Sequence, residues 1–302
     1  MAPLSPDLII GVASGLLHAL FFAISVNIYK GQREGIHPVA VSALKMWVAF
    51  LLMGFIVLVT LRASALQVPM DNVVILSISM ITSMVVGDTL YLLSQERIGV
   101  AYAYPISNVY PVVTYILSMA LLGEAFVMAR WFGAILAVTG VVLLSWEQNR
   151  NKREELDVRG RTIVGIVLVI LAILCYAAGT VLVQVGLEGV DPLDANFVRT
   201  MVCSFVFVPI YGLARYKGMD RPTKKATKVT AIAALFGMGF GSLLYAISVK
   251  YVGATTMSVM ASMGPIFGLP MSVHHLNEKV TLRAVVGTII SIIGVTLVVI
   301  GF

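Results

Sequence analysis

Two stretches decide the fold, LGEAFVMARWFGAILAVTG at residues 122–140 and LNEKVTLRAVVGTIISIIG at residues 276–294. Each contains a glutamate between two apolar runs, followed by two glycines, and the spacing is the same in both. The matching residues are Glu124, Gly133 and Gly140 in the first stretch and Glu278, Gly287 and Gly294 in the second. A pattern that recurs at fixed spacing indicates an internal repeat.

The composition is that of an integral membrane protein. Of the 302 residues, 59% are hydrophobic and 12% are charged, whereas soluble domains carry about 25% charged residues. The chain divides into apolar runs of roughly the 20 residues that a helix needs to cross a bilayer. Ten transmembrane helices are predicted, at residues 8–29, 39–61, 73–94, 101–121, 131–146, 162–187, 193–214, 229–249, 255–275 and 282–301.

A shift of 154 residues, the distance from Glu124 to Glu278, aligns the two halves of the chain without a gap. Besides the two opening stretches, the identical pairs include Gly11/Gly165, Pro38/Pro192, Gly87/Gly241, Tyr91/Tyr245, Gly99/Gly253 and Pro111/Pro265. The predicted organisation is a first repeat at residues 1–150, a polar linker at 151–160 and a second repeat at 161–302.

Because each repeat contains five helices, an odd number, the second repeat enters the membrane from the opposite side. The predicted fold class is therefore an all-α integral membrane protein with ten transmembrane helices in two inverted five-helix repeats. Inverted repeats build transporters whose site opens alternately to each side of the membrane.

The basic residues predict the orientation. The side of the membrane that holds the termini has only Arg62, Arg130 and Lys250, while the opposite side carries the basic segments 147–161 and 215–228. Cytoplasmic loops carry the excess of Lys and Arg. The protein is therefore predicted to lie in the cell membrane (the inner, or cytoplasmic, membrane) with both termini on the outer side. The start of the chain lacks the basic residues of a signal peptide, so the first helix is expected to be retained. No nucleic-acid partner is expected.

Ten helices as five plus five, a basic residue early in the second and seventh helices, and the repeated Glu–Gly–Gly stretch resemble the EamA-type drug/metabolite transporter (DMT) superfamily over nearly the whole chain. The resemblance implies a secondary active transporter of small organic metabolites, amino-acid-like or otherwise amphipathic, with alternating access through a central cavity at the repeat interface. Similar proteins are often exporters. Many have cytoplasmic termini, from which the orientation predicted here departs.

Two alternatives stay open. An importer, or an uncoupled facilitator or exchanger, belongs to the same class. A receptor or scaffold that transports nothing belongs to another class, and it does not require inverted repeats. The expected partners are a small-molecule substrate and the lipid bilayer, with protons as the coupling ion of the secondary active transporter, and the protein is expected to be a monomer.

Ionisable residues inside membrane spans are costly and therefore mark functional sites. His18 and Asp88 are such residues, and they break the repeat symmetry, because their counterparts are Ala172 and Ser242. Other polar residues follow them at helical spacing. The predicted substrate-binding residues are His18, Asp88, Tyr91, Tyr104, Asn108, Tyr245, Ser258 and Ser262. Asp88 is expected to meet a cationic group or a proton, or to pair with Lys45; the alternative for the whole set is hydrogen bonding between helices.

Other residues have predicted roles outside this set. Lys45 and Arg199 are aligned by the repeat and form an anion-binding or structural pair. Proline removes a backbone hydrogen bond and favours a kink, so the prolines of the fourth and ninth helices are hinge candidates. These are Pro105, Pro111, Pro265 and Pro270. Glu124 and Glu278 are predicted caps, because a carboxylate at the start of a helix meets free N–H groups.

Enzyme functions have little support. The segment HHLNEK resembles the metal motif H-x-x-E-H, but Lys279 occupies the position of the second histidine. The chain has no G-x-S-x-G elbow and no Walker A sequence. We therefore expect neither catalysis nor a metal site or cofactor.

Overall fold

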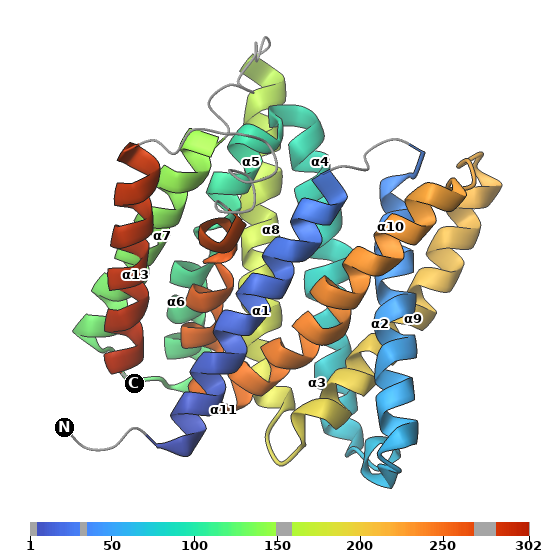
Figure 1. Ribbon diagram of the computed structural model, residues 1–302, viewed down its shortest axis with the longest axis horizontal. Helices are drawn as coiled ribbons and strands as arrows, with labels where there is room; N and C mark the ends of the chain where they lie inside the picture. Colours follow the sequence, from blue (N-terminus) through green and yellow to red (C-terminus); the bar gives the residue numbers. More distant parts are fainter. Residues whose placement is uncertain (1–4, 31–34, 149–158, 269–281, 302) are drawn as a thin grey trace. The chain divides into compact units, whose positions relative to one another are not determined.

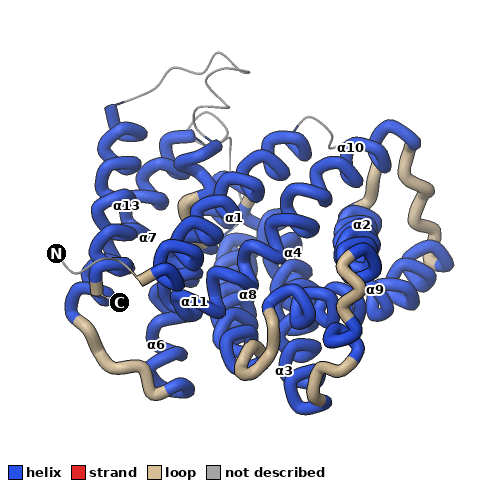
Figure 2. Tube along the Cα trace, turned by 60° about the horizontal axis from the view of Figure 1, so that its bottom comes forward, coloured by secondary structure: helices blue, strands red, loops and turns tan. Residues whose placement is uncertain are grey.

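The computed structural model describes residues 5–30, 35–148, 159–268 and 282–301, and within these ranges all regular secondary structure is helical (Figures 1 and 2). Seven helices are long and apolar enough to cross a membrane. Two shorter apolar helices, Met128–Leu143 and Val285–Ile300, accompany them. The longest described helix, Lys224–Ala261, includes the whole of the eighth predicted span and the start of the ninth, and Gly253 separates these two parts with a non-helical φ of 76°. The described helices thus confirm an all-α membrane fold and are consistent with ten spans.

The elements follow the repeat. The first repeat contains α1 (Pro6–Lys30), α2 (Pro38–Val59), η1 (Ala63–Leu66), α3 (Met70–Met80), η2 (Ile81–Gly87), α4 (Asp88–Ile98), α5 (Val100–Ser107), α6 (Tyr110–Leu122) and α7 (Met128–Gln148). The second contains α8 (Arg159–Gly186), α9 (Pro192–Tyr216), α10 (Lys224–Ala234), η4 (Leu235–Phe240), α11 (Gly241–Ala261) and α13 (Leu282–Ile300).

The chain folds into two compact units, each of which combines segments of both repeats. Unit 1 consists of Met1–Met80 and Val183–Tyr251, and unit 2 consists of Ile81–Leu182 and Val252–Phe302. The sequence repeats and the compact units are therefore two different divisions of the same chain.

In unit 1, α2 packs against its repeat counterpart α9 (Figure 1). Trp47 Nε1 donates to the carbonyl oxygen of Ser204 at 3.2 Å, and Ser204 Oγ donates to the carbonyl oxygen of Met46 at 2.9 Å. Further along α2, Gly54 faces the ring of Phe197. Contacts move toward the start of α9 as they move toward the end of α2, so the two helices are antiparallel.

In unit 2, α7 and its counterpart α13 pack in the same manner, side by side in Figures 1 and 2. Gly133 lies against Gly294, and Gly140 lies against Gly287. A Cβ atom on Gly133 would be 2.7 Å from the carbonyl oxygen of Gly294, so the backbones approach closely because these residues lack side chains. In the repeat, Gly287 is the counterpart of Gly133 and Gly294 is the counterpart of Gly140. Each glycine of α7 therefore contacts the counterpart of the other one. This reciprocal, antiparallel contact confirms that the repeats are inverted.

The third and eighth predicted spans each contain a π-helical segment. The segments are η2 and η4, and their first residues, Ile81 and Leu235, are aligned by the 154-residue shift. Aligned glycines accompany them, and a Cβ atom on Gly241 would lie 2.8 Å from the carbonyl oxygen of Phe236. π-helical turns are rare and are frequent at functional sites. Their presence at the same place in both repeats directs attention to the residues beside them.

Candidate functional site

The predicted substrate-binding residues fall into two groups, one in each unit. Unit 1 holds His18 on α1, Tyr245 on α11, Arg199 on α9 and Lys45 on α2. Unit 2 holds Asp88, Tyr91, Tyr104, Asn108, Ser258 and Ser262. Each unit therefore contains its own group of polar side chains, to which helices of both repeats contribute.

His18 lies on α1 and contacts the beginning of α11. Its Nδ1 atom is 2.8 Å from the carbonyl oxygen of Gly241, and its ring centroid is 5.4 Å from that of Tyr245. A carbonyl oxygen only accepts hydrogen bonds, so Nδ1 carries the proton and donates it. In the neutral ring, Nε2 is then an acceptor. Because η4 ends immediately before Gly241, the π-helical segment sets the position of this carbonyl group.

Arg199 is a buried cation whose side chain meets uncharged groups. The residue is 5% exposed, and its guanidinium carbon is 5.8 Å from the centroid of the Tyr245 ring. Nη2 donates to the sulfur of Met80 at 3.6 Å, a weak acceptor. Among the described residues, Nε and Nη1 have no hydrogen-bond partner. The buried guanidinium group thus has two nitrogen donors, Nε and Nη1, without an acceptor among the described residues.

Asn196 precedes Arg199 by one turn of α9 and contacts α11 in a similar way. Its Nδ2 atom donates to Ser242 Oγ at 3.0 Å. Because the Ser242 hydroxyl donates to carbonyl oxygens of the preceding turn, it accepts from Asn196, which fixes the orientation of the amide. Asn196 Oδ1 is buried and has no partner in the described part of the chain. Two contacts therefore join α9 to α11, Asn196–Ser242 and Arg199–Tyr245.

In unit 2 the corresponding place is acidic and aromatic. Asp88 is the first residue of α4, directly after η2, and its Oδ1 atom accepts a hydrogen bond from the hydroxyl of Tyr176 on α8 at 2.7 Å. The Tyr176 ring packs edge-on against Tyr91 and Tyr110, with centroid distances of 6.4 Å to each. Tyr110 donates its hydroxyl to the carbonyl oxygen of Ser258 at 3.0 Å. Asp88 and Tyr91 are thus brought together with two tyrosines that the sequence did not single out.

Tyr176, Asn196 and the π-helical segments were not predicted from the sequence. Tyr176 lies one turn beyond Ala172, the counterpart of His18, so the symmetry itself pointed to this face of α8. Asn196 lies one turn before Arg199 on the same face of α9. The π-helical segments had no signal apart from their aligned glycines, Gly87 and Gly241.

The remaining predicted polar residues use their side chains locally. Asn108 Nδ2 donates to the carbonyl oxygen of Tyr104 at 2.8 Å. Ser258 and Ser262 each donate to a carbonyl oxygen of α11 at 2.7 Å. These contacts leave acceptor atoms on all three side chains, and their role in substrate binding stays a prediction.

The fourth and ninth spans are interrupted at aligned positions. In the fourth span, α5 ends at Ser107 and α6 begins at Tyr110, with Pro105 inside α5 and Pro111 at the start of α6. In the ninth, turn residues at 262–263 precede a short helical stretch that contains Pro265. Interrupted helices at matching positions are typical of transporter sites. Pro270 lies outside the described residues, and the hinge role of all four prolines stays a prediction.

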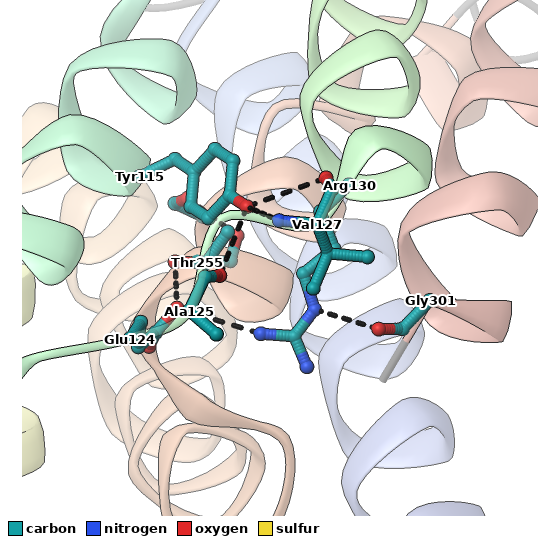
Figure 3. A network of polar contacts seen from close by, with 8 residues as sticks. Tyr115, Glu124, Ala125, Val127, Arg130, Thr255 and Gly301 are labelled. Atoms are coloured by element: carbon teal, nitrogen blue, oxygen red, sulfur yellow. Dashed lines mark hydrogen bonds and ion pairs between the residues drawn. The ribbon is translucent and has the colours of Figure 1, made fainter.

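Glu124 belongs to a polar network within unit 2 (Figure 3). Its Oε2 atom accepts a hydrogen bond from Thr255 Oγ1 at 3.0 Å and lies 3.5 Å from Nη1 of Arg130. Arg130 Nε donates to the carbonyl oxygen of Gly301 at 3.0 Å. The predicted opening of this helix at Glu124 needs correction, because α7 begins at Met128. The carboxylate instead links the α6–α7 connection to α11 and, through Arg130, to the end of α13. Glu278 lies outside the described residues.

A second group of ion pairs joins the residues that follow α2 to the start of α9 in unit 1. Arg62 lies 3.0 Å from Asp191 Oδ2 and 3.2 Å from Asp194 Oδ1. The hydrogen bond to Asp191 raises the pKa of the Arg62 guanidinium above its ordinary value. Asp191 also caps α9, since its Oδ1 accepts from the backbone N–H of Leu193 at 2.9 Å. Asp194 is therefore occupied by Arg62.

A two-repeat helical membrane fold with ionisable side chains buried between helices of the two repeats defines the class, a multi-pass membrane transporter. The chain belongs to the EamA-like transporter family, whose model matches residues 9–146 and 163–300. The two matches start and end 154 residues apart, which is the shift found in the sequence. The family implies a small-molecule substrate and a location in the lipid bilayer.

Relatives of this chain are also named as transporters. A protein named uncharacterized transporter from Methanothermobacter thermautotrophicus is 22% identical over 296 residues, covering 94% of this chain and 84% of its own. Another of that name from Archaeoglobus fulgidus is 20% identical over 230 residues, covering 76% of this chain and 77% of its own. A solved structure, titled only as a crystal structure of protein, has a TM-score of 0.78 at 13% identity, covering 95% and 96% of the two chains. This structure has the same fold.

Proposed function

We propose that the protein is a secondary active transporter that exports small organic metabolites, amino-acid-like or otherwise amphipathic, by alternating access. The observation that carries this proposal is the pair of polar contacts beside the π-helical segments. In unit 1, His18 bonds to Gly241 at the end of η4. In unit 2, Tyr176 bonds to Asp88 at the end of η2. Family membership supplies the transport class, and these buried groups are the candidates for substrate and ion contacts.

The symmetry supports alternating access at the interface between the repeats. The first helix of each repeat, α1 or α8, contacts the third span of the other repeat at its π-helical segment. Two nearly equivalent arrangements of one scaffold allow two conformations of comparable free energy. In this proposal the third and eighth spans bend at their π-helical segments, and the fourth and ninth spans bend at the breaks at 108–109 and 262–263.

The two contacts differ in chemistry, and this difference supports ion coupling. The Tyr176 hydroxyl donates to Asp88, so a proton or a cationic group that reaches this carboxylate competes with the tyrosine. At the counterpart position in the second repeat the residue is Ser242, which carries no charge. Asp88 is thus the proposed coupling residue, and the protein acts as a monomer in the cell membrane with both termini outside.

Flux into and out of reconstituted vesicles tests the proposal. Wild-type protein is expected to move members of a metabolite panel in a pH-dependent manner, and Asp88→Asn is expected to abolish the pH dependence while the protein remains folded. Thr89→Val is the matched control, because Thr89 is exposed and its hydroxyl bonds to the carbonyl oxygen of Val85.

Each alternative has its own outcome in this assay. Flux without pH dependence in the wild type indicates a facilitator or exchanger, and flux that supports only uptake indicates an importer. No flux of any compound in either direction contradicts transport and favours a receptor or scaffold.

A further inference from the structure

We infer that Arg199 recognises a carboxylate on the transported solute, and that Asn196 accepts a hydrogen bond from a donor group next to that carboxylate. The substrate class is then small organic acids with an adjacent amino or hydroxyl group. This inference rests on the proposed transport function and specifies what the unit 1 site takes.

The first step is the state of the Arg199 side chain. A guanidinium group buried in a membrane span is costly unless its charge and its donors are satisfied. Here Nη2 has a thioether as its acceptor, the face lies near an aromatic ring, and Nε and Nη1 have no partner among the described residues. Neither the thioether nor the aromatic ring is anionic, so in the described part of the chain no anion meets the guanidinium group.

Two other arginines in the chain show what satisfied groups look like. Arg130 has the carboxylate of Glu124 at 3.5 Å and a backbone carbonyl oxygen at 3.0 Å. Arg62 has two carboxylates, and one of them is Asp194, which lies on α9 like Arg199. The acidic residue of α9 is therefore already paired with Arg62, and we assign the anion that completes Arg199 to the transported solute.

The chemistry of the unpaired groups selects a carboxylate with a neighbouring donor. A guanidinium presents a planar fork of N–H donors that fits a carboxylate with two parallel hydrogen bonds. Residues three apart on a helix lie about 5–6 Å apart at their Cβ atoms, so Asn196 is within the reach of one small molecule. Its free Oδ1 is an acceptor, and it requires a donor such as an ammonium or a hydroxyl group.

Contacts with neighbouring side chains hold the guanidinium group of Arg199 and the amide of Asn196 in place. The Tyr245 ring lies near both the guanidinium group and the His18 ring, and His18 is fixed by its hydrogen bond to Gly241. Asn196 is fixed by Ser242. Both recognition groups are thus held by contacts with α11 before a ligand arrives, which reduces the entropy lost on binding.

Thermal stabilisation of the purified full-length protein measures binding independently of flux. The probes are acids paired with their amides: alanine and alaninamide, leucine and leucinamide, lactate and lactamide. At least one acid is expected to raise the melting temperature while its amide does not. Propionate, which has no donor beside its carboxylate, is expected to bind more weakly than lactate. Equal shifts for acids and amides would overturn the inference.

Substitutions separate recognition from a structural role. Arg199→Met removes the unpaired charge and keeps an apolar side chain, so the ligand-free melting temperature is expected to stay equal or rise. Acid binding is expected to weaken by about 100-fold or more, the range for loss of one partner of a buried charge pair. Arg199→Lys keeps the charge without the fork and is expected to retain part of the binding. Arg62→Gln is the control, since it lowers stability and leaves the preference for acids unchanged.

The outcomes also separate this inference from the proposed function. Flux that prefers amides or cationic solutes, or acid binding retained by Arg199→Met, contradicts Arg199 as the recognition residue while transport stands. Acid-specific stabilisation that Arg199→Met abolishes, in a protein without flux, supports the recognition site and contradicts transport.

Discussion

Tyr176 shows how one hydroxyl group can distinguish packing from function. It donates to Asp88 at 2.7 Å, while its ring packs against Tyr91 and Tyr110. Hydrogen bonds between helices in membranes contribute on average about 0.6 kcal/mol, which is less than a threefold effect on an equilibrium. A loss of transport much larger than this requires that the hydroxyl act on the Asp88 carboxylate during the cycle.

Tyr176→Phe is expected to lower the melting temperature slightly and to reduce coupled flux by about tenfold or more, since each tenfold step needs about 1.4 kcal/mol. Tyr110→Phe is the matched control: it removes a hydroxyl of the same kind from a neighbouring ring, but one that donates to a backbone carbonyl. Melting curves and flux from the same preparations measure both effects. Equal loss of flux in the two variants would contradict a special role for the bond to Asp88.

At the scale of elements, the α7–α13 contact depends on glycine at its crossing points. A methyl group on Gly133 would lie 2.7 Å from the carbonyl oxygen of Gly294, and this oxygen belongs to helix backbone that cannot move aside. Overfilling a packed interface costs about 1–3 kcal/mol. Gly212 on α9 offers the contrast, because nothing lies within 4 Å of a Cβ atom built there.

Gly133→Ala is therefore expected to destabilise the protein by about 1–3 kcal/mol, and Gly212→Ala is expected to stabilise it by up to about 1 kcal/mol, since alanine favours a helix over glycine. Denaturation of the two variants in the same detergent gives the signs. Stability changes of the same sign and size would mean that helix propensity, and not the close approach, governs both positions.

Apolar run length and repeat symmetry were sufficient to predict the helices and their inversion, because both depend on local residue types. The π-helical segments were not predictable in this way, since the same residues form α or π turns depending on their neighbours. The start of α7 was predicted at Glu124, about one turn too early. The αL turn at Gly123 and the ion pair with Arg130 hold Glu124 in the connection before the helix. For the candidate site, symmetry breaking made His18 and Asp88 candidates, but it did not reveal their partners on other helices.

At the scale of the whole molecule, the orientation in the membrane is a prediction from the distribution of basic residues. The segment 215–228 is basic, and the charge distribution predicts that it lies in the cytoplasm. A cysteine that replaces Arg221, in a variant with Cys175 and Cys203 changed to alanine, is expected to resist an impermeant thiol reagent added to intact cells. A cysteine at Ser5 is expected to react. Reaction at Arg221→Cys and protection at Ser5→Cys would reverse the orientation, and with it the assignment of sides in the export cycle.

The pairing of α7 with α13 also has a consequence for biogenesis. The ribosome completes α7 at Gln148 and reaches α13 only at Leu282, and translation proceeds at roughly 5–20 residues per second. For a time on the order of ten seconds, the glycine-lined face of α7 is in the bilayer without its partner, accessible to lipid and to other nascent helices. Helix α2 is likewise completed before its partner α9 is synthesised. Insertion intermediates of this chain are therefore obligatory, and a chaperone or a lipid that shields the α7 face in this interval would determine how much protein reaches the folded state.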